Sequence, residues 1–333
     1  MLFAGVLFAL TDRVTLLLTA AIIGVISPSG YEVGPFLAVE QAALSQIVPD
    51  ERRTQIFGWY NLIGSFATAA GALAGGGMTE FLQEAGMLPL NSYRTIVILY
   101  GVIGLLLALL FTRLSSSVEI AHSASARTWF HLGLHRSRGV VLKLSALFGL
   151  DAFAGGFVVQ SLVAYWFHIR FGVEPAALGA IFFGANILAG ISALAAAWVA
   201  ARIGLVNTMV FTHLPSNLLL MLVPLMPNLP LAIVVLFMRF GISQMDVPPR
   251  HSYTIAMVAP DERSAAAGVT GIARSIGAAI SPTFAGAFLS NSVLLSAPFL
   301  VAGGLKVVYD ILLYLSFRAV KGADQEAPII EKD

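Results

Sequence analysis

The sequence Val-Pro-Asp-Glu-Arg at residues 48–52 returns 211 positions later as Ala-Pro-Asp-Glu-Arg at residues 259–263. Each copy is a short charged turn between two long apolar stretches. The same shift superimposes Ala67 on Ala278, and it carries apolar stretches onto apolar stretches. Since the turn recurs in matching surroundings, it indicates an internal repeat and therefore two halves of similar topology.

The composition is that of a membrane protein. Hydrophobic residues make up 58% of the chain and charged residues 11%, against roughly half and a quarter in a soluble domain. Apolar runs of about 18 residues or more can satisfy their backbone polar groups in lipid only as helices, so we predict an all-α polytopic membrane protein. The net charge of +1 argues against nucleic-acid binding. The lack of cysteine excludes disulfides, a thiol nucleophile and thiolate metal sites.

Nine full spans are expected after an initial apolar fragment at residues 1–10. That fragment has no basic leader and is too short to cross a membrane, so it resembles a helix cut in half rather than a signal peptide. The first full span is tilted or broken, because Pro28 and Pro35 remove backbone donors from it. The expected spans are Val14–Val48, Thr54–Gly77, Tyr93–Thr112, Gly139–His168, Pro175–Ala201, Leu205–Met226, Leu229–Val258, Ser264–Ser290 and Leu295–Phe317.

Lys and Arg outside the spans predict the orientation. Alternate loops carry thirteen of them, against three in the opposite loops, and the positive-inside rule places the richer set in the cytoplasm. The three are Arg13, Arg94 and Arg170. The thirteen are Arg52, Arg53, Arg113, Arg127, Arg136, Arg138, Lys143, Arg202, Arg250, Arg263, Arg318, Lys321 and Lys332.

The repeat and the loops together predict the domain organisation. Residues 1–113 form an incomplete N-terminal helical bundle, 114–138 a cytoplasmic linker, 139–317 a C-terminal bundle of six helices, and 318–333 a cytoplasmic tail. Under the 211-residue shift, the first half lacks about 70 residues, or two helices and the start of a third. A complete chain would have six plus six helices.

Six plus six helices, a basic central loop and a charged turn after the fourth and tenth helices resemble the major facilitator superfamily of secondary transporters. The resemblance implies that this chain contains part of helix 3 through helix 12 of that two-bundle fold. It implies a permease that carries a small-molecule substrate, with protons, by alternating access. We expect a monomer in contact with membrane lipid, in the cell membrane, with a cytoplasmic C-terminus, no cofactor, no metal site and no enzymatic activity.

Small residues in the span Thr54–Gly77 resemble that family's antiporter motif, G-x8-G-x3-G-P-x2-G-G. Ala67 replaces a glycine and Ala72 the proline of the motif. Where the resemblance holds, it implies an exporter that exchanges substrate for protons. The alternative is that small residues merely allow close helix packing. The matching glycines are Gly58, Gly71, Gly75 and Gly76.

Ionisable residues inside the spans are candidates for the transport pathway, because each costs about 2.5 to 3.5 kcal/mol at the bilayer centre. Asp151 and Asp246 lie in spans that, by the resemblance, line the central cavity. Either could carry a proton; alternatively, each is held permanently by a buried arginine. Arg239 shares a helical face with Asp246 but lies about 10 Å away along the axis, so Arg274 is the favoured partner. An arginine left unpaired would favour an anionic substrate.

Prolines predict a hinge in the same region. Pro248 and Pro249 interrupt the helix just after Asp246, and the region of Glu32 and Pro35 is similarly broken in the first half. Polar and aromatic side chains that could line the cavity are Trp59, Tyr60, Asn61, Gln160, Trp166, Asn186, His213 and Asn217.

Other charges are expected at the gate or in structural pairs. Glu40, near the cytoplasmic end of its span, is expected to pair with Arg52 or Arg263. Lys306 and Asp310 are four residues apart and can pair along one helical face. The charged turns hold the gate and loop residues Glu40, Asp50, Arg52, Asp261 and Arg263.

The sequence therefore predicts a secondary transporter, in the direction of efflux and coupled to protons. Two alternatives stay open: a non-transporting membrane protein, such as a lipid-modifying enzyme or a receptor, and an inactive truncated transporter. The absence of a nucleotide-binding motif argues against primary active transport.

Overall fold

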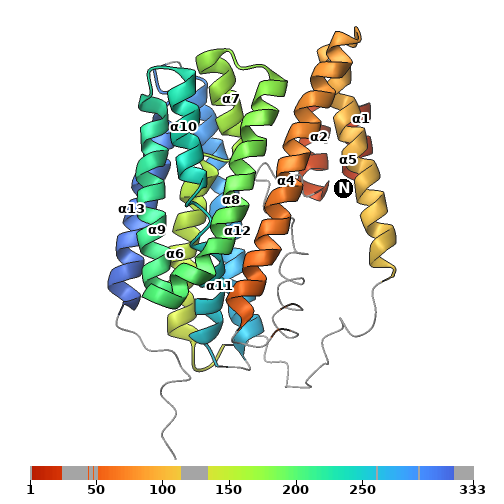
Figure 1. Ribbon diagram of the computed structural model, residues 1–333. Helices are drawn as coiled ribbons and strands as arrows, with labels where there is room; N and C mark the ends of the chain where they lie inside the picture. The colour runs from red at the N-terminus through yellow and green to blue at the C-terminus, as the bar shows by residue number, and fades with distance from the viewer. Residues whose placement is uncertain are drawn as a thin grey trace, which may run out of the picture.

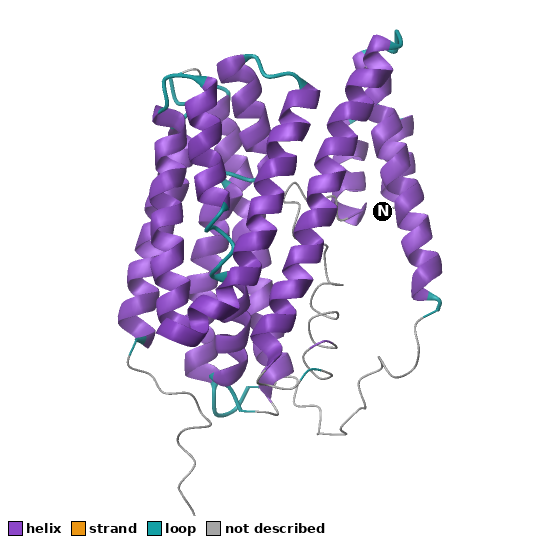
Figure 2. Ribbon diagram, in the orientation of Figure 1, coloured by secondary structure: helices purple, strands orange, loops and turns teal. Residues whose placement is uncertain are grey.

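The computed structural model describes residues 2–24, 44, 48, 52–113, 134–259, 262–291 and 293–318. In this part of the chain the regular structure is helical, without a strand (Figure 2). Helix α4 lies between α8 on one side and α1, α2 and α5 on the other (Figure 1). The helices before the basic loop are α1 (Leu2–Leu10), α2 (Val14–Gly24), α4 (Arg53–Glu84) and α5 (Pro89–Phe111).

The second group of helices follows the basic loop. A 3-10 turn, η3 (Val223–Leu225), extends α9. The helices are α6 (Arg138–Gly156), α7 (Gln160–Phe171), α8 (Pro175–Ile203), α9 (Leu205–Leu222), α10 (Leu229–Phe240), α11 (Val247–Ala256), α12 (Arg263–Leu289) and α13 (Ala297–Phe317).

Seven helical segments in the described residues are long and apolar enough to cross a membrane. One of them, residues 138–171, combines α6 and α7. The outer faces carry large apolar side chains such as Ile63, Leu110 and Leu315, each more than 60% exposed, whereas charged side chains such as Asp151, Arg250 and Asp310 are buried. This distribution suits a lipid environment. The predicted all-α polytopic membrane fold is confirmed. Of the expected span Val14–Val48, the structure describes residues 14–24, 44 and 48.

The expected span Leu229–Val258 is two helices, and the break lies earlier than predicted. Helix α10 ends at Phe240, a series of turns covers residues 241–246, and α11 begins at Val247. Pro248 and Pro249 thus stand in the first turn of α11, where a missing N–H costs nothing. A proline ring clashes with the carbonyl group four residues earlier, so the prolines disrupt the residues before them rather than those after.

The arrangement of helices follows the internal repeat. The 211-residue shift carries α4 onto α12, α5 onto α13 and α1 into α9. Helix α1 packs on α5 through Gly5 and Gly101. The corresponding helices α9 and α13 pack through Gly303, where an added Cβ would lie 3.1 Å from the Asn217 carbonyl oxygen. Close packing through glycine is a common way for membrane helices to associate. The two halves therefore share a helix pairing as well as a turn.

Candidate functional site

Six ionisable side chains meet inside the second group of helices, and we call them the buried charge cluster. They come from α6, α9, α11, α13 and the link between α10 and α11, and none is more than 8% exposed. Charges removed from water at this depth are tolerated only in pairs or networks. The members are Asp151, His213, Asp246, Arg250, Lys306 and Asp310.

Arg250 joins two carboxylates of the cluster. Its Nη1 donates to Asp151 Oδ2 at 3.3 Å, and its Nη2 donates to Asp246 Oδ2. Asp246 precedes Arg250 by one turn, since the Arg250 backbone N–H donates to the Asp246 carbonyl oxygen. The guanidinium also lies 5.6 Å from the centre of the Phe148 ring. Arg250 thereby ties the break in the α10–α11 segment to α6.

Asp151 is the junction between this arginine and α13. Lys306 Nζ donates to Asp151 Oδ1 at 2.6 Å, and His213 Nε2 lies 3.7 Å from the same oxygen. On its other side, His213 Nδ1 lies 2.7 Å from Asp310 Oδ1. Asn217 Nδ2 donates to the second oxygen of Asp310 at 2.9 Å. The contacts therefore form one continuous chain from Asp246 to Asp310.

Helical spacing and small residues place these groups. His213 and Asn217 are four residues apart on α9, so both face α13. Gly303 allows α9 to approach α13 two turns before Asp310. On α6, Gly155 lies beside the Lys306 ammonium, which would be in ordinary contact with an added Cβ at 3.7 Å. The backbone approach brings short side chains such as aspartate within direct contact.

Three expectations about these charges need correction. Arg250 is expected in a cytoplasmic loop, but it lies inside α11 and is 4% exposed. The expected partner of Asp246 was Arg274 on another helix, and its partner is Arg250. Lys306 and Asp310 were expected to pair with each other, but each bonds across to another helix. The Asp-x3-Arg spacing of residues 246–250 was the available signal for the first two.

The other pathway residues have mixed outcomes. Asn186 on α8 donates to the Gln160 side chain at the start of α7 at 3.1 Å, so the structure brings these two together. Arg239 is half-buried beside the Phe240 ring, and Arg274 is half-buried on α12. The residues Glu32, Pro35, Glu40, Asp50 and Asp261 lie outside the described part of the chain.

The second charged turn holds the segment that leads into α6. The Glu262 carboxylate is 1% exposed and accepts backbone N–H groups of His135, Arg136 at 2.8 Å and Ser137 at 2.9 Å. Burial raises the pKa of Glu262, but the hydrogen bonds from Ser137, His135 and Arg136 outweigh burial and lower the pKa to about 2. Arg52 is exposed and Arg263 half-buried. The gate role of this turn stays a prediction.

The glycines of the antiporter-like motif divide into two sets. A Cβ added at Gly76 would lie 2.6 Å from the Pro175 carbonyl oxygen, and one at Gly58 would lie 3.4 Å from the Ala193 carbonyl oxygen, so both positions pack closely on α8. Gly71 and Gly75 have no described atom within 4 Å of an added Cβ. Two of the four matching glycines therefore bring α4 against α8.

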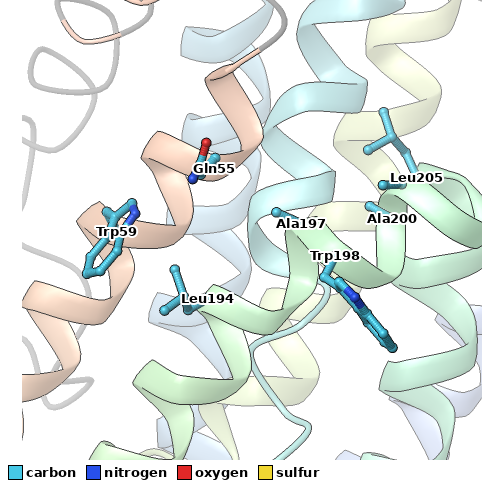
Figure 3. A pocket seen from close by; sticks show the side chains of 8 residues that line it. Gln55, Trp59, Leu194, Ala197, Trp198, Ala200 and Leu205 are labelled. Carbon is cyan, nitrogen blue, oxygen red and sulfur yellow. The ribbon is translucent and has the colours of Figure 1, made fainter.

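A cavity of about 650 Å³ lies between the same two helices and reaches the start of α9; none of its lining residues belongs to the buried charge cluster. Gln55 and Trp59 on α4 stand opposite Leu194 and Ala197 on α8 (Figure 3). Trp198 also lines the cavity, and the Arg202 guanidinium lies 3.5 Å from the centre of its ring. The further lining residues are Ala200, Ala201 and Leu205.

Comparisons with known proteins agree with this fold. An uncharacterized membrane protein of Saccharomyces cerevisiae is 27% identical over 350 aligned positions, which cover 96% of this chain and 78% of that protein. A bacterial homologue of the human lysosomal transporter Spinster has a similar structure, with a TM-score of 0.65 at 15% identity, covering 96% of this chain and 80% of that one.

Two further solved structures have the same fold. The human organic anion transporter TETRAN gives a TM-score of 0.60 at 17% identity, over 93% of this chain and 74% of that one. The Escherichia coli fucose:proton symporter gives 0.56 at 16% identity, over 96% and 82%. The family model of the Major Facilitator Superfamily matches residues 1–245 and 170–331, and together with the helical fold this shows that the chain belongs to that superfamily of membrane transporters.

Proposed function

We propose that this membrane transporter moves a small solute by proton-coupled alternating access, in the direction of efflux. Residues 1–113 and 139–317 act as the two bundles, and the chain works as a monomer in the cell membrane with its C-terminus in the cytoplasm. The proposal assigns no enzymatic reaction to it. The single observation that carries the proposal is the buried charge cluster.

The cluster supports a role in transport because burying its ionisable groups costs free energy. Replacing a buried ion pair by well-packed apolar residues is often neutral or stabilising, so six ionisable groups at membrane depth are weak as a stability device. Ionisable groups inside membrane helices commonly mark substrate or proton pathways. Asp151 and Asp246 both bond to Arg250. Arg250 lies in the first turn of α11, just after the helix break. A change of charge at either carboxylate would therefore act on a discontinuous helix.

The direction of transport rests on the contact between α4 and α8. Gly58 and Gly76 occupy positions of the antiporter-like motif and pack against α8. Phe57 on α4 also lies 5.4 Å from the His251 ring on α11. These are contacts between the two groups of helices, and alternating access requires such contacts to rearrange. Their position supports a role for the motif in the conformational cycle.

Proton-coupled flux in proteoliposomes tests the proposal. A thermal-shift screen of small solutes on the full chain supplies candidate substrates, and a pH-sensitive dye reports proton movement when each is added. Asp151→Asn and Asp246→Asn should reduce coupled proton movement to the background of empty vesicles. Asp12→Asn is the matched control, because this carboxylate lies on the surface beside Arg94. Undiminished coupling in both buried variants would contradict the proposal.

A further inference from the structure

We infer that His213 and Asp310 form the proton-binding site of the buried charge cluster, and that the exchangeable proton sits on His213 Nε2. The imidazole would then load and release the proton, and Asp151 beside it would pass the change of charge on to Arg250 and the helix break. Its place in coupling rests on the proposed transport function, whereas the presence of the proton does not.

The charges of the cluster show where a proton is needed. Asp151 and Asp246 are matched by Arg250 and Lys306, which bond to them directly. The remaining pair, His213 and Asp310, is neutral as a whole only when two protons are shared between them. With one proton the pair carries a negative charge, which is unfavourable at positions that are 5% and 0% exposed.

Geometry accounts for both protons. The 2.7 Å contact between His213 Nδ1 and Asp310 Oδ1 requires one proton between these atoms, because two bare acceptors would repel each other. His213 Nε2 faces Asp151 Oδ1 at 3.7 Å. This distance is too long for a hydrogen bond, but a positive charge on the ring is attracted to the Asp151 carboxylate at this range. Since Nδ1 is committed to Asp310, we place the second proton on Nε2, and imidazole is the group that ordinarily exchanges protons near neutral pH.

Apart from Asp151, the side chains described next to His213 and Asp310 are uncharged. From α13, the Tyr309 ring packs edge-on against the imidazole at 5.7 Å, and its buried hydroxyl has no hydrogen-bond partner among the described residues. From α9, the Asn217 side-chain nitrogen donates to Asp310 Oδ2 at 2.9 Å and lies 3.1 Å from His213 Nδ1. The described residues also contain no group of three side chains that could hold a metal ion.

Other ionisable side chains on the packed helices have contacts of their own. Lys143 of α6 lies over the Phe317 ring, and Arg202 of α8 over Trp198. Arg239 of α10 lies beside Phe240, and His251 of α11 beside Phe57. The other ionisable side chains on α6, α11, α12 and α13 are Arg138, Tyr253, Arg263, Arg274 and Tyr314.

Protonation at Nε2 would reach the helix break through Asp151. A proton on Nε2 places a positive charge 3.7 Å from Asp151 Oδ1, the oxygen that Lys306 also binds. The other oxygen of Asp151 accepts from Arg250, the first basic residue after the break. Loss of the proton removes one of the three cations around Asp151 and strengthens its hold on the other two. The proton thus sets how firmly α6 is tied to α11 and α13.

Nitrogen-15 NMR of the full chain in lipid, labelled at its six histidines, tests the inference. The signals of His213 are identified by their loss in His213→Gln. We expect both ring nitrogens of His213 to be protonated near neutral pH. In Asp310→Asn the imidazole should become neutral, with one protonated nitrogen, whereas Asp310→Glu should retain both protons and Asp12→Asn should not differ from the wild type.

The wild-type spectrum alone can overturn the inference, even if Asp310→Asn fails to fold. A His213 ring with one unprotonated nitrogen near pH 7 would contradict it. Failure of the transport proposal is distinguishable: a doubly protonated His213 without coupled flux would sink that proposal alone. Coupled flux with a neutral His213 would sink the proton site alone.

Discussion

Arg250 shows what a single residue contributes to the interior of this transporter. Its guanidinium bonds to Asp246 on its own chain segment and to Asp151 on α6, and it is 4% exposed. The sequence indicated both carboxylates, because each stands alone in an apolar span. It did not indicate their partners, because these depend on which faces of α6, α11 and α13 meet.

Replacing Arg250 should destabilise the folded protein strongly. Arg250→Met leaves two carboxylates without their shared cation, and removal of one partner of a buried pair costs about 3–5 kcal/mol. The double variant Arg250→Met with Asp246→Asn should recover part of this loss. The free energy of unfolding, measured with denaturant in detergent, gives both values.

Arg202→Met is the control for that measurement. Arg202 lies over the exposed ring of Trp198 rather than in the cluster, and loss of such a contact should cost about 0.5–1 kcal/mol. A loss in Arg250→Met no larger than in Arg202→Met would show that the buried pairs contribute nothing to the folded state.

At the scale of the element, the charged turn and the broken helix were both visible in the sequence. The turn at residues 259–263 is expected to act at the gate, and the structure adds that Glu262 binds the backbone of the segment before α6. These hydrogen bonds join residues more than 120 positions apart, so no local pattern could indicate them. The helix break was placed after Asp246, but proline sterics move it to residues 241–246.

The hydrogen bonds of the Glu262 carboxylate should make stability depend on pH in the acid range. The pKa of Glu262 is lowered from 4.5 to about 2 in the folded state. Its contribution is therefore complete above pH 4.5 and is lost as the pH falls toward 2. At neutral pH, Glu262→Gln should lower the free energy of unfolding by about 1.5–3 kcal/mol, and the difference from the wild type should shrink on acidification.

Thermal unfolding across this pH range checks the expectation. Glu84→Gln removes an exposed carboxylate at the end of α4 and should change stability by less than about 0.5 kcal/mol. A difference between Glu262→Gln and the wild type that stays constant down to pH 2 would argue against the ionised carboxylate as the source of this stability.

At the scale of the whole molecule, the sequence was most informative. Hydropathy and the 211-residue repeat were sufficient for the helical membrane fold and its family, because a lipid environment permits few alternatives to packed helices. The cluster was less accessible, since Lys306 and Asp310 lie four residues apart and suggested a local pair. Their actual partners depend on the close approach of α13 to α6 and α9.

The central claim is that protonation biases two bundles between alternating states, and spin-label distance measurements test it most directly. The chain contains no cysteine, so two cysteines can be introduced for labelling without removing native ones. One double variant places labels at Thr112 and Arg318, at the ends of α5 and α13. The other places labels at Glu84 and Asn291, at the opposite ends of α4 and α12. All four positions are exposed.

In lipid, acidification should shift both distance distributions in opposite directions, with one pair approaching as the other separates. The shift should be absent in Asp151→Asn, whose loss of charge releases Lys306 and Arg250. A single distance for each pair, unchanged from neutral to acidic pH in the wild type, would contradict the account.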